Sequence, residues 1–476
     1  MKTTTAVGIL KTTIGNPLTR NILKPMSKYC EKDGKNRIEV AIDLYTGKRE
    51  DACISCKIAS KLIKKVLIKG GEAFGLNEDD LKEKFKDSYW AKALASTVRG
   101  IAFFGVRRPF TAGAPYQVVW DVTSSCNLKC KHCYSTSGKK RDDELNTEEA
   151  KKAIDIMAKA GVTIIAFSGG EPLVRKDIFE LAKYSANKGI YVAMATNATL
   201  ITKEIVRKMR ENGIKFVQIS LDGATPEIHD SFRGVEGAFE KTVKGIKNCV
   251  DEGFFVEVST TATHFNYKQI PDIIDLVESI GVNWFMVFNF VPTGRGRFII
   301  DNDLTPQERE ELLKMLWKKS KTSKIEILST APQFARVALQ EENAKENELA
   351  MPTHFYNPRL QGQLVNLAEF IGGCGAGRFY MALEPNGDLQ PCVFFPLKIG
   401  NILEDDFEEL WMKNKVLEDL RNKDIIEKCR SCDYRYYCGG CRARAYGYFG
   451  DYLKPDPGCI NNIEFYEMIR EKWKQM

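Results

Sequence analysis

Three cysteines, Cys126, Cys130 and Cys133, form a CxxxCxxC pattern directly after the apolar run 116–122. A structural zinc or iron site takes four protein ligands, whereas this cluster supplies only three thiolates. Three thiolates on a four-iron cluster leave one iron open, and an open metal position is where chemistry takes place. The alternative is an incomplete zinc ribbon, which the motifs further along the chain disfavour.

A glycine-rich turn follows the next apolar run, where Gly169, Gly170 and Glu171 stand in the sequence SGGEP. Two glycines let the backbone approach a ligand closely, and Glu171 adds a hydrogen-bond acceptor beside them. Alone, such a turn is ordinary. Placed at a strand end downstream of CxxxCxxC, it predicts a binding site.

Short polar residues also end the next two apolar runs: Asn197 after 191–195, and Ser220 and Asp222 at the end of 216–221. Polar groups at consecutive strand tips suit a ribose and a carboxylate. Asn, Asp and Ser also occupy turns for backbone reasons, so each of these residues has a structural alternative.

The sixth apolar run leads into the turn Val291-Pro-Thr-Gly-Arg295-Gly. Arg295 is placed to bind a substrate carboxylate through a bidentate pair. The alternative is a charged residue on a glycine-rich turn.

The C-terminal region 374–459 holds seven further cysteines, namely Cys374, Cys392, Cys429, Cys432, Cys438, Cys441 and Cys459. CxxC spacings in a long chain are typical of metal or iron–sulfur ligands rather than disulfides. Asn386-Gly387 is a hairpin signal, so Cys392 should follow a tight turn. A zinc ribbon is the alternative for the four cysteines between 429 and 441.

Cys30, Cys53 and Cys56 form a third group near the N-terminus. A CxxC preceded by another cysteine predicts an extra metal site, with Cys249 or a non-thiol as the fourth ligand. Plain buried thiols are the alternative.

Strand-like and helix-like segments alternate between residues 116 and 325. The expected strands are 117–122, 162–167, 191–195, 216–221, 255–261 and 284–290, and the expected helices are 147–160, 177–188, 202–211, 239–251, 270–280 and 305–319. Helix starts are indicated at Asn146 and Thr305. This alternation predicts a parallel sheet with right-handed crossovers.

The chain has 476 residues, of which 28% are charged and 43% apolar, and we expect a cytoplasmic protein of two or three domains. Region 57–110 is helical in pattern and carries twelve Lys/Arg against six Asp/Glu. It predicts either a cap packed on the sheet or a peripheral contact with the inner face of a membrane. No nucleic-acid partner is expected, because the basic stretch lacks a known RNA-binding motif.

The cysteine triplet and the GGEP turn resemble the radical S-adenosylmethionine (SAM) superfamily, and region 374–460 resembles its SPASM domain. The resemblance implies an α/β fold, a partial (β/α)6 barrel with an N-terminal helical extension and a C-terminal cysteine-rich domain. It divides the chain into 1–114 (extension), 115–325 (core), 326–373 (linker) and 374–476 (SPASM domain and last helix).

The same resemblance assigns roles to single residues. It implies that Cys126, Cys130 and Cys133 hold the catalytic [4Fe–4S] cluster, and that Gly169, Gly170 and Glu171 bind the amino group of SAM. It makes Asn197, Ser220 and Asp222 candidate SAM contacts, Arg233 a partner of the SAM carboxylate, and Tyr134 a neighbour of the adenine or a core aromatic.

For the SPASM domain, the resemblance implies that Cys429, Cys432, Cys438 and Cys459 bind one auxiliary [4Fe–4S] cluster. Cys374, Cys392 and Cys441 would bind a second, which lacks an obvious fourth cysteine. That second cluster takes a non-cysteine ligand, recruits a distant thiol, keeps an open iron, or is absent. The spacing of two between Cys438 and Cys441 also departs from the family's usual three.

The implied function is an oxidoreductase that cleaves SAM reductively to a 5′-deoxyadenosyl radical, which abstracts hydrogen from an unactivated C–H bond of a bulky substrate. A ferredoxin or flavodoxin is the expected reductant. The substrate is a tetrapyrrole side chain, favoured by the VPTGRG turn, or a ribosomal peptide or protein. The alternatives are radical C–C bond formation on membrane lipid chains and, in another class, a non-catalytic iron–sulfur scaffold or electron carrier.

Overall fold

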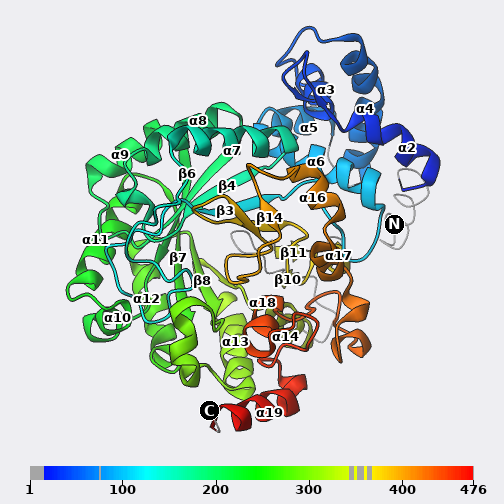
Figure 1. Cartoon of the computed structure of the whole chain (residues 1–476). Helices are drawn as coiled ribbons and strands as arrows, with labels where there is room; N and C mark the ends of the chain where they lie inside the picture. Colours follow the sequence, from blue (N-terminus) through cyan, green and yellow to red (C-terminus); the bar gives the residue numbers. More distant parts are fainter. Residues whose placement is uncertain (1–14, 74–76, 342–347, 351–358, 362–366, 475–476) are drawn as a thin grey trace.

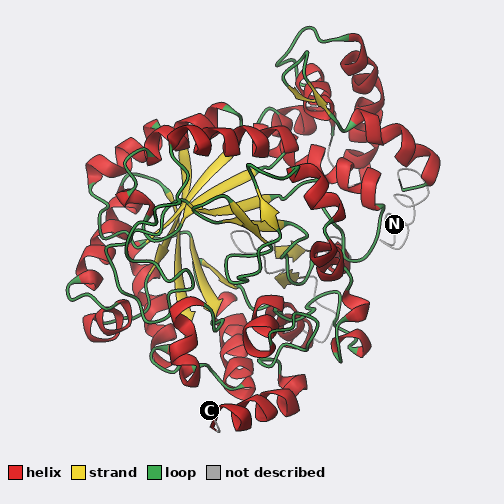
Figure 2. Cartoon of the chain, in the orientation of Figure 1, coloured by secondary structure: helices red, strands yellow, loops and turns green. Residues whose placement is uncertain are grey.

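A curved parallel sheet forms the centre of the molecule, with helices on its outer face (Figures 1 and 2). The structure is a computed structural model that describes residues 15–73, 77–341, 348–350, 359–361 and 367–474. The sheet has ten strands in the order β14-β13-β12-β3-β4-β5-β6-β7-β8-β9. Strands β12 and β3 to β9 pair in parallel, and β12, β13 and β14 pair antiparallel.

The six expected core strands and six expected helices are all present, with ends shifted by at most two residues. The strands are β3 (Gln117–Asp121), β4 (Ile164–Ser168), β5 (Tyr191–Thr196), β6 (Ile214–Ser220), β7 (Phe255–Ala262) and β8 (Trp284–Asn289). The six helices are α7 (Thr147–Ala160), α8 (Ile178–Asn187), α9 (Lys203–Glu211), α11 (Ala238–Asp251), α12 (Ile270–Ile280) and α13 (Pro306–Ser320). A further helix that the sequence analysis did not expect, α10 (Pro226–Arg233), precedes α11. The partial (β/α)6 barrel is confirmed.

Both predicted helix starts are confirmed by their capping geometry. Asn146 accepts hydrogen bonds from the N–H groups of Glu148 and Glu149, and the Glu149 carboxylate accepts from the Asn146 N–H. Thr305 and Glu308 form the same reciprocal pair at the start of α13, where Pro306 occupies the first turn. These side chains satisfy N–H groups that the helix itself leaves without partners.

Four strands outside the expected core extend the sheet, β9 at one end and β12, β13 and β14 at the other. β9 (Glu326–Ser329) pairs with β8, and β12 (Tyr380–Leu383) pairs with β3. The expected linker 326–373 therefore contains a barrel strand and α14 (Gln333–Glu341), which packs on α13. The segment 351–354, expected to be irregular, lies outside the described residues.

The C-terminal region supplies the remaining strands and helices. They are β10 (Glu348–Ala350), β11 (Arg359–Gln361), β13 (Asp388–Gln390), β14 (Gly400–Asn401), α15 (Ala368–Ile371), α16 (Phe407–Lys413), α17 (Lys415–Arg421), α18 (Arg442–Phe449) and α19 (Ile463–Lys474). The predicted turn joins β12 to β13 with Gly387 at φ +88°, and Cys392 follows β13 as expected.

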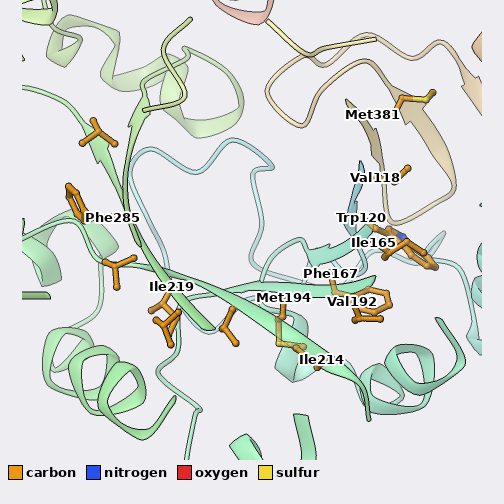
Figure 3. Packing of buried hydrophobic residues seen from close by; sticks show 14 of the residues in the cluster. Val118, Trp120, Ile165, Phe167, Val192, Met194, Ile214, Ile219, Phe285 and Met381 are labelled. Atoms are coloured by element: carbon orange, nitrogen blue, oxygen red, sulfur yellow. The ribbon is translucent and has the colours of Figure 1, made fainter. Parts of the chain in front are cut away.

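Alternate residues of the strands build two apolar layers. The outward layer packs under the helices and includes Trp120, Phe167 and Met194 (Figure 3). The inward layer contains Val119, Phe216 and Tyr380, among others. Because burial on both faces removes apolar area from water at about 25 cal/mol per Å2, this double layer is the main source of stability.

The N-terminal extension packs as a separate lobe at the upper right of Figure 1. Its elements are α2 (Pro17–Met26), β1 (Tyr29–Cys30), β2 (Lys35–Asn36), α3 (Arg37–Tyr45), α4 (Ile54–Ala73), α5 (Glu78–Phe85) and α6 (Ser88–Phe104). In α6, Lys92 is buried against Glu39 at 3.2 Å and Arg99 against Glu408 at 2.6 Å. Lys92 therefore ties α6 to α3 within the lobe, and Arg99 joins the lobe to the rest of the chain, so neither faces solvent.

One inward residue gives the barrel a pH dependence. Glu257 of β7 is fully buried beside the Gln218 amide, and burial raises its pKa to about 8, from an ordinary value of 4.5. Between these values the folded protein keeps a proton that the unfolded chain loses, so stability falls as the pH rises from about 5 to about 8.

Glu257→Gln is expected to weaken this pH dependence. The wild-type contribution is at most about 1.4 kcal/mol per pH unit, and the neutral amide removes it. Thermal melting at pH 5, 6, 7 and 8 should show a smaller fall in the midpoint for the variant than for the wild type. Glu211→Gln, at an exposed position of α9, is the control and should melt as the wild type does. Parallel curves for wild type and E257Q would contradict a neutral Glu257.

Candidate functional site

The three cysteines lie in the loop after β3, at the carboxyl ends of the parallel strands, and line one pocket. Each sulfur has an N–H donor nearby. The N–H of Leu128 lies 3.4 Å from Cys126 Sγ, the N–H of Ser137 lies 3.4 Å from Cys133 Sγ, and Arg233 Nη1 lies 3.7 Å from Cys130 Sγ. Such donors stabilise anionic sulfur and tune the potential of an iron–sulfur cluster.

Burial makes two of these thiols, those of Cys126 and Cys130, poor acids on their own. It raises the pKa of Cys126 to about 11 and also raises the pKa of Cys130, which the Arg233 guanidinium partly opposes. Thiolates at this position therefore require a cation such as iron. The donor set of three sulfurs from one loop fits an iron–sulfur cluster with one iron left for another ligand.

A buried ion pair packs against the cysteine loop and supports it. Arg233, at the end of α10, lies 2.6 Å from the carboxylate of the fully buried Asp222, and its backbone carbonyl accepts from the N–H of Lys129. His132 Nε2 lies 3.4 Å from the same carboxylate, and its ring stacks on Phe232 at 4.1 Å. The resemblance implied Asp222 and Arg233 as SAM contacts, and this stays a prediction: Arg233 lines the pocket, whereas Asp222 does not. In the structure the pair holds Cys130 and the loop.

The GGEP turn packs directly against the cysteine loop. Gly169 has φ +122°, and a Cβ there would lie 2.5 Å from the Thr123 carbonyl oxygen. A Cβ on Gly170 would lie 2.1 Å from the Ser125 carbonyl oxygen. Both glycines line the pocket, so they are required for backbone packing as well as for access by a ligand.

Glu171 lies beneath the pocket and is fully buried. Its carboxylate accepts from the Thr196 hydroxyl at 2.8 Å and from the Asn197 N–H at 2.8 Å, so it holds the tip of β5. Burial raises its pKa to about 7. The contact between Glu171 and SAM stays a prediction, since Glu171 is not among the residues that line the pocket.

Of the other candidate SAM contacts, Asn197 and Tyr134 line the pocket and Ser220 does not. Asn197 lines the pocket and donates to Asn127 at 2.9 Å. Tyr134 also lines it; its hydroxyl donates to Asp121 at 2.9 Å and lies 3.0 Å from the Ser168 hydroxyl, which fixes the ring. Ser220 is absent from the lining, whereas its register partner Ser259 is present.

Sequence reasoning missed several lining residues, among them Ser259, Thr261, Asn289 and Phe394. Ser259 and Thr261 lie near the tip of β7, and Asn289 ends β8, so the polar tips of these two strands could have indicated them. Phe394 follows β13, and nothing in its local sequence places it here. Its ring meets the Tyr134 ring edge to face at 5.1 Å.

Arg295 of the VPTGRG turn faces the cysteine loop. Its Nε donates to the Cys130 carbonyl at 2.9 Å, its Nη1 donates to the Ser137 carbonyl, and its own N–H donates to the Cys133 carbonyl at 2.8 Å. A Cβ on Gly294 would lie 2.2 Å from the Tyr134 carbonyl oxygen, so the turn packs flat on the loop. The turn therefore holds the loop that carries Cys126, Cys130 and Cys133 in place.

Arg295→Ala is expected to lower the iron content and the rate of SAM cleavage by about tenfold, because the loss of a group that orients metal ligands costs 10–100-fold. Arg297→Ala is the matched control, since Arg297 bonds only the Gly294 carbonyl within its own turn. Iron analysis and an anaerobic cleavage assay measure both. Unchanged cleavage with a raised KM for a carboxylate-bearing substrate would show that Arg295 binds substrate instead.

The seven C-terminal cysteines fall into the two sets that the resemblance implied. Cys429, Cys432, Cys438 and Cys459 line one cavity, of about 310 Å3. Cys374, Cys392 and Cys441 line another, of about 320 Å3. Asp456 links the sets, because its carboxylate accepts from the N–H groups of Cys441 at 2.8 Å and Gly458 at 2.9 Å. Cluster binding by each set stays a prediction.

Comparison with known proteins agrees with this geometry. Residues 120–280 match the model of the radical SAM superfamily, and residues 374–433 match the SPASM model, described as an iron–sulfur cluster-binding domain. AdoMet-dependent heme synthase from Methanosarcina barkeri is 38% identical over 350 residues, 73% of this chain and 97% of the relative. Mycofactocin maturase MftC from Mycobacterium tuberculosis is 31% identical, over 75% of this chain and 86% of the relative.

A solved structure supports the fold. Streptococcus suis SuiB bound to S-adenosylmethionine is similar with a TM-score of 0.59 and 18% identity, over 89% of this chain and 92% of that chain. No helix among the described residues combines the length and apolar character that crossing a membrane requires. Family membership implies [4Fe–4S] clusters and SAM as cofactors, which the donor set of the pocket fits. The chain belongs to the radical SAM superfamily and is an enzyme with a C-terminal SPASM domain.

Proposed function

We propose that this enzyme oxidises a C–H bond on the side chain of a tetrapyrrole. The observation that carries the proposal is the cavity of about 320 Å3 between α6 and the SPASM domain. Its lining includes Tyr89, Trp90, Phe110 and Tyr380, and no charged side chain is found among the described residues around it. An aromatic, uncharged cavity suits a flat apolar macrocycle better than a peptide backbone.

The cavity adjoins the pocket of the catalytic cysteines. Asn289, Val291 and Phe394 line both spaces. Cys374, Cys392 and Cys441 line the opposite part of the cavity. A substrate held there would lie between the site of hydrogen abstraction and the auxiliary cysteines, which suits an oxidation in which an electron must leave the substrate.

When bound, SAM and its cluster supply a carbon-centred radical that takes hydrogen from an unactivated C–H bond. The chain's own residues orient the reactants and exclude water. Arg295, Arg233 and the GGEP turn fix the cysteine loop. The aromatic lining keeps the cavity dry, which protects a reactive intermediate from solvent.

The similarity to heme synthase over nearly its whole length supports a tetrapyrrole substrate. The weaker similarity to mycofactocin maturase supports the peptide alternative. A decarboxylating or desaturating attack on a propionate side chain would place the macrocycle in the cavity, with the side chain toward Phe394.

The test uses iron coproporphyrin III deuterated on its propionate chains, incubated anaerobically with enzyme, SAM and dithionite. We expect deuterium in the 5′-deoxyadenosine product and a loss of mass from the porphyrin. Ala376→Phe, which adds a ring to the cavity, should abolish porphyrin turnover but keep SAM cleavage, whereas Ala376→Ser should behave as the wild type. Absence of deuterium transfer, or full turnover in A376F, would contradict the proposal.

A lipid chain is the second candidate, and exposed apolar residues on the N-terminal lobe favour it. Leu18 and Ile22 of α2 and Ile54 and Ile58 of α4 are each more than half exposed. Lys57, Lys61 and Lys65 are also exposed on α4, a pattern that suits an anionic bilayer surface. Co-sedimentation with anionic liposomes should fall in the Ile54→Glu, Ile58→Glu double variant; equal partitioning with the wild type would remove this candidate.

A further inference from the structure

A fourth group of metal-ligand side chains lies in the N-terminal lobe, outside both cluster regions. Helices α3 and α4 of this lobe stand apart from the barrel in Figure 1. Cys30 ends β1, Asp33 lies in the turn between β1 and β2, and Cys53 and Cys56 stand at the start of α4. One ligand atom from each of the four lies within 4.8 Å of all the others. Cys249, considered as a fourth ligand from sequence, lies instead on α11 and is buried in the barrel core.

Two distances between these atoms match the edges of a single tetrahedron. Cys30 Sγ lies 3.7 Å from Cys53 Sγ and 3.5 Å from Asp33 Oδ2. A tetrahedral zinc ion with Zn–S of about 2.3 Å and Zn–O of about 2.0 Å has S···S edges of about 3.8 Å and S···O edges of about 3.5 Å. A four-iron cluster would spread the ligands more widely, because each would bind a different iron.

The surroundings prepare Asp33 to act as a ligand. Its side chain is only 4% exposed, and Cys30 and Cys56 are buried beside it. Arg49 Nη2 donates to Asp33 Oδ1 at 2.8 Å, which orients the carboxylate and leaves Oδ2 toward Cys30. An outer partner of this kind is the usual support of a metal ligand.

Local backbone geometry also holds the four residues in place. The N–H of Gly34 donates to the Cys30 carbonyl at 2.8 Å, and Gly34 has φ +68°, so the turn after Cys30 is tight. The N–H of Cys53 lies 3.3 Å from the Asp33 carboxylate, which ties the start of α4 to the same turn. The two parts of the site therefore meet without a covalent link between them.

A disulfide explains this arrangement less well. All fourteen cysteines are free, and pairing any two of these three would leave the third thiol and the buried carboxylate side by side. Arg49 pairs with Oδ1 of this carboxylate, whereas Oδ2 lies toward the Cys30 thiol, where a metal ion would be its cationic partner. A divalent metal with thiolate and carboxylate ligands satisfies all four groups together.

We propose that Cys30, Asp33, Cys53 and Cys56 bind one structural zinc ion that fastens the β1–β2 hairpin to α4. The ion is separate from the iron–sulfur clusters. The hairpin in turn contacts the barrel, because Glu31 pairs with Lys159 of α7 at 2.5 Å. The zinc therefore fixes the element through which this part of the lobe meets the core.

Zinc analysis of the full-length protein, combined with X-ray absorption at the zinc edge, tests the proposal. The zinc edge is blind to iron, so the clusters do not interfere. We expect about one zinc per chain, with three sulfur neighbours at about 2.3 Å and one oxygen at about 2.0 Å. Less than about 0.2 zinc per chain after growth with added zinc, or iron in this position, would overturn the assignment.

Variants locate the ion. Cys53→Ala should lose the zinc, whereas Cys249→Ala, which removes a buried thiol elsewhere, should keep it. Asp33→Cys should keep the zinc and change its shell to four sulfur neighbours, while Asp43→Asn, at a buried acid of α3 outside the group, should leave the shell unchanged. An unaltered shell in D33C, or full zinc content in C53A, would show that the ion is bound elsewhere.

Discussion

Replacing Cys130 with alanine is expected to lower SAM cleavage by more than about 100-fold, because loss of a ligand should cost more than loss of a group that merely orients one. Cys130 is the most buried of the three loop cysteines, and Arg233 lies beside its sulfur. Two remaining thiolates would hold the cluster poorly. Iron content should fall by about four per chain, the size of one cluster.

The measurement is the amount of 5′-deoxyadenosine formed after anaerobic incubation with dithionite and SAM. Cys249→Ala is the matched control, because Cys249 is also buried but lies on α11 and does not line the pocket. SAM cleavage at the wild-type rate in C130A would show that the loop cysteines do not bind the cluster. The same loss in C249A would point to a general folding defect.

The second large effect is expected for Cys429→Ala, which should reduce substrate turnover by more than about tenfold while SAM cleavage stays within about twofold of wild type. Cys429 lies in a cavity that shares no lining residue with the pocket of the catalytic loop. Its loss should leave that loop intact. The oxidation of the substrate requires an electron to leave it, and we expect the rate of this step to fall.

Ser431→Ala is the control for this prediction. Ser431 lies in the same short turn as Cys429, and its hydroxyl donates only to the Lys428 carbonyl at 2.9 Å. Porphyrin turnover and 5′-deoxyadenosine are measured in one assay, so the two steps are compared directly. Full turnover in C429A would contradict a catalytic role for the auxiliary site, and equal loss of both activities would indicate a structural one.

The fold of the core was predictable because its signals are local. Each strand from β3 to β8 is a short apolar run, and each helix has an apolar face of regular period, so the order and ends of these elements follow from the sequence. The pairing of β12 with β3 was not predictable in this way. Tyr380–Leu383 is short, and its partner lies far away in the sequence.

For the candidate site, too, some features could be predicted from the sequence and others could not. The cysteine triplet could be recognised from its spacing, and the division of the C-terminal cysteines into two sets followed from the resemblance to the family. The orientation of individual side chains could not be predicted from the sequence. Arg295 belongs to a recognisable turn, but only the fold shows that its guanidinium bonds the carbonyls of Cys130 and Ser137.

Asp33 shows the same limit. Nothing in the local sequence separates it from the other acids of the N-terminal lobe. Its role follows from the tight turn at Gly34 and from the position of α4, which bring its carboxylate to Cys30 and Cys53. Tertiary contacts of this kind lie beyond any pattern in the chain.

The most direct test is electron–nuclear double resonance on the reduced, anaerobically purified enzyme with SAM labelled with 15N in its amino group. If the loop of Cys126, Cys130 and Cys133 leaves one iron for SAM, the cluster signal should show coupling to the labelled nitrogen. A cluster of unchanged signal, with no nitrogen coupling and no 5′-deoxyadenosine formed, would show that the fourth iron is closed to SAM.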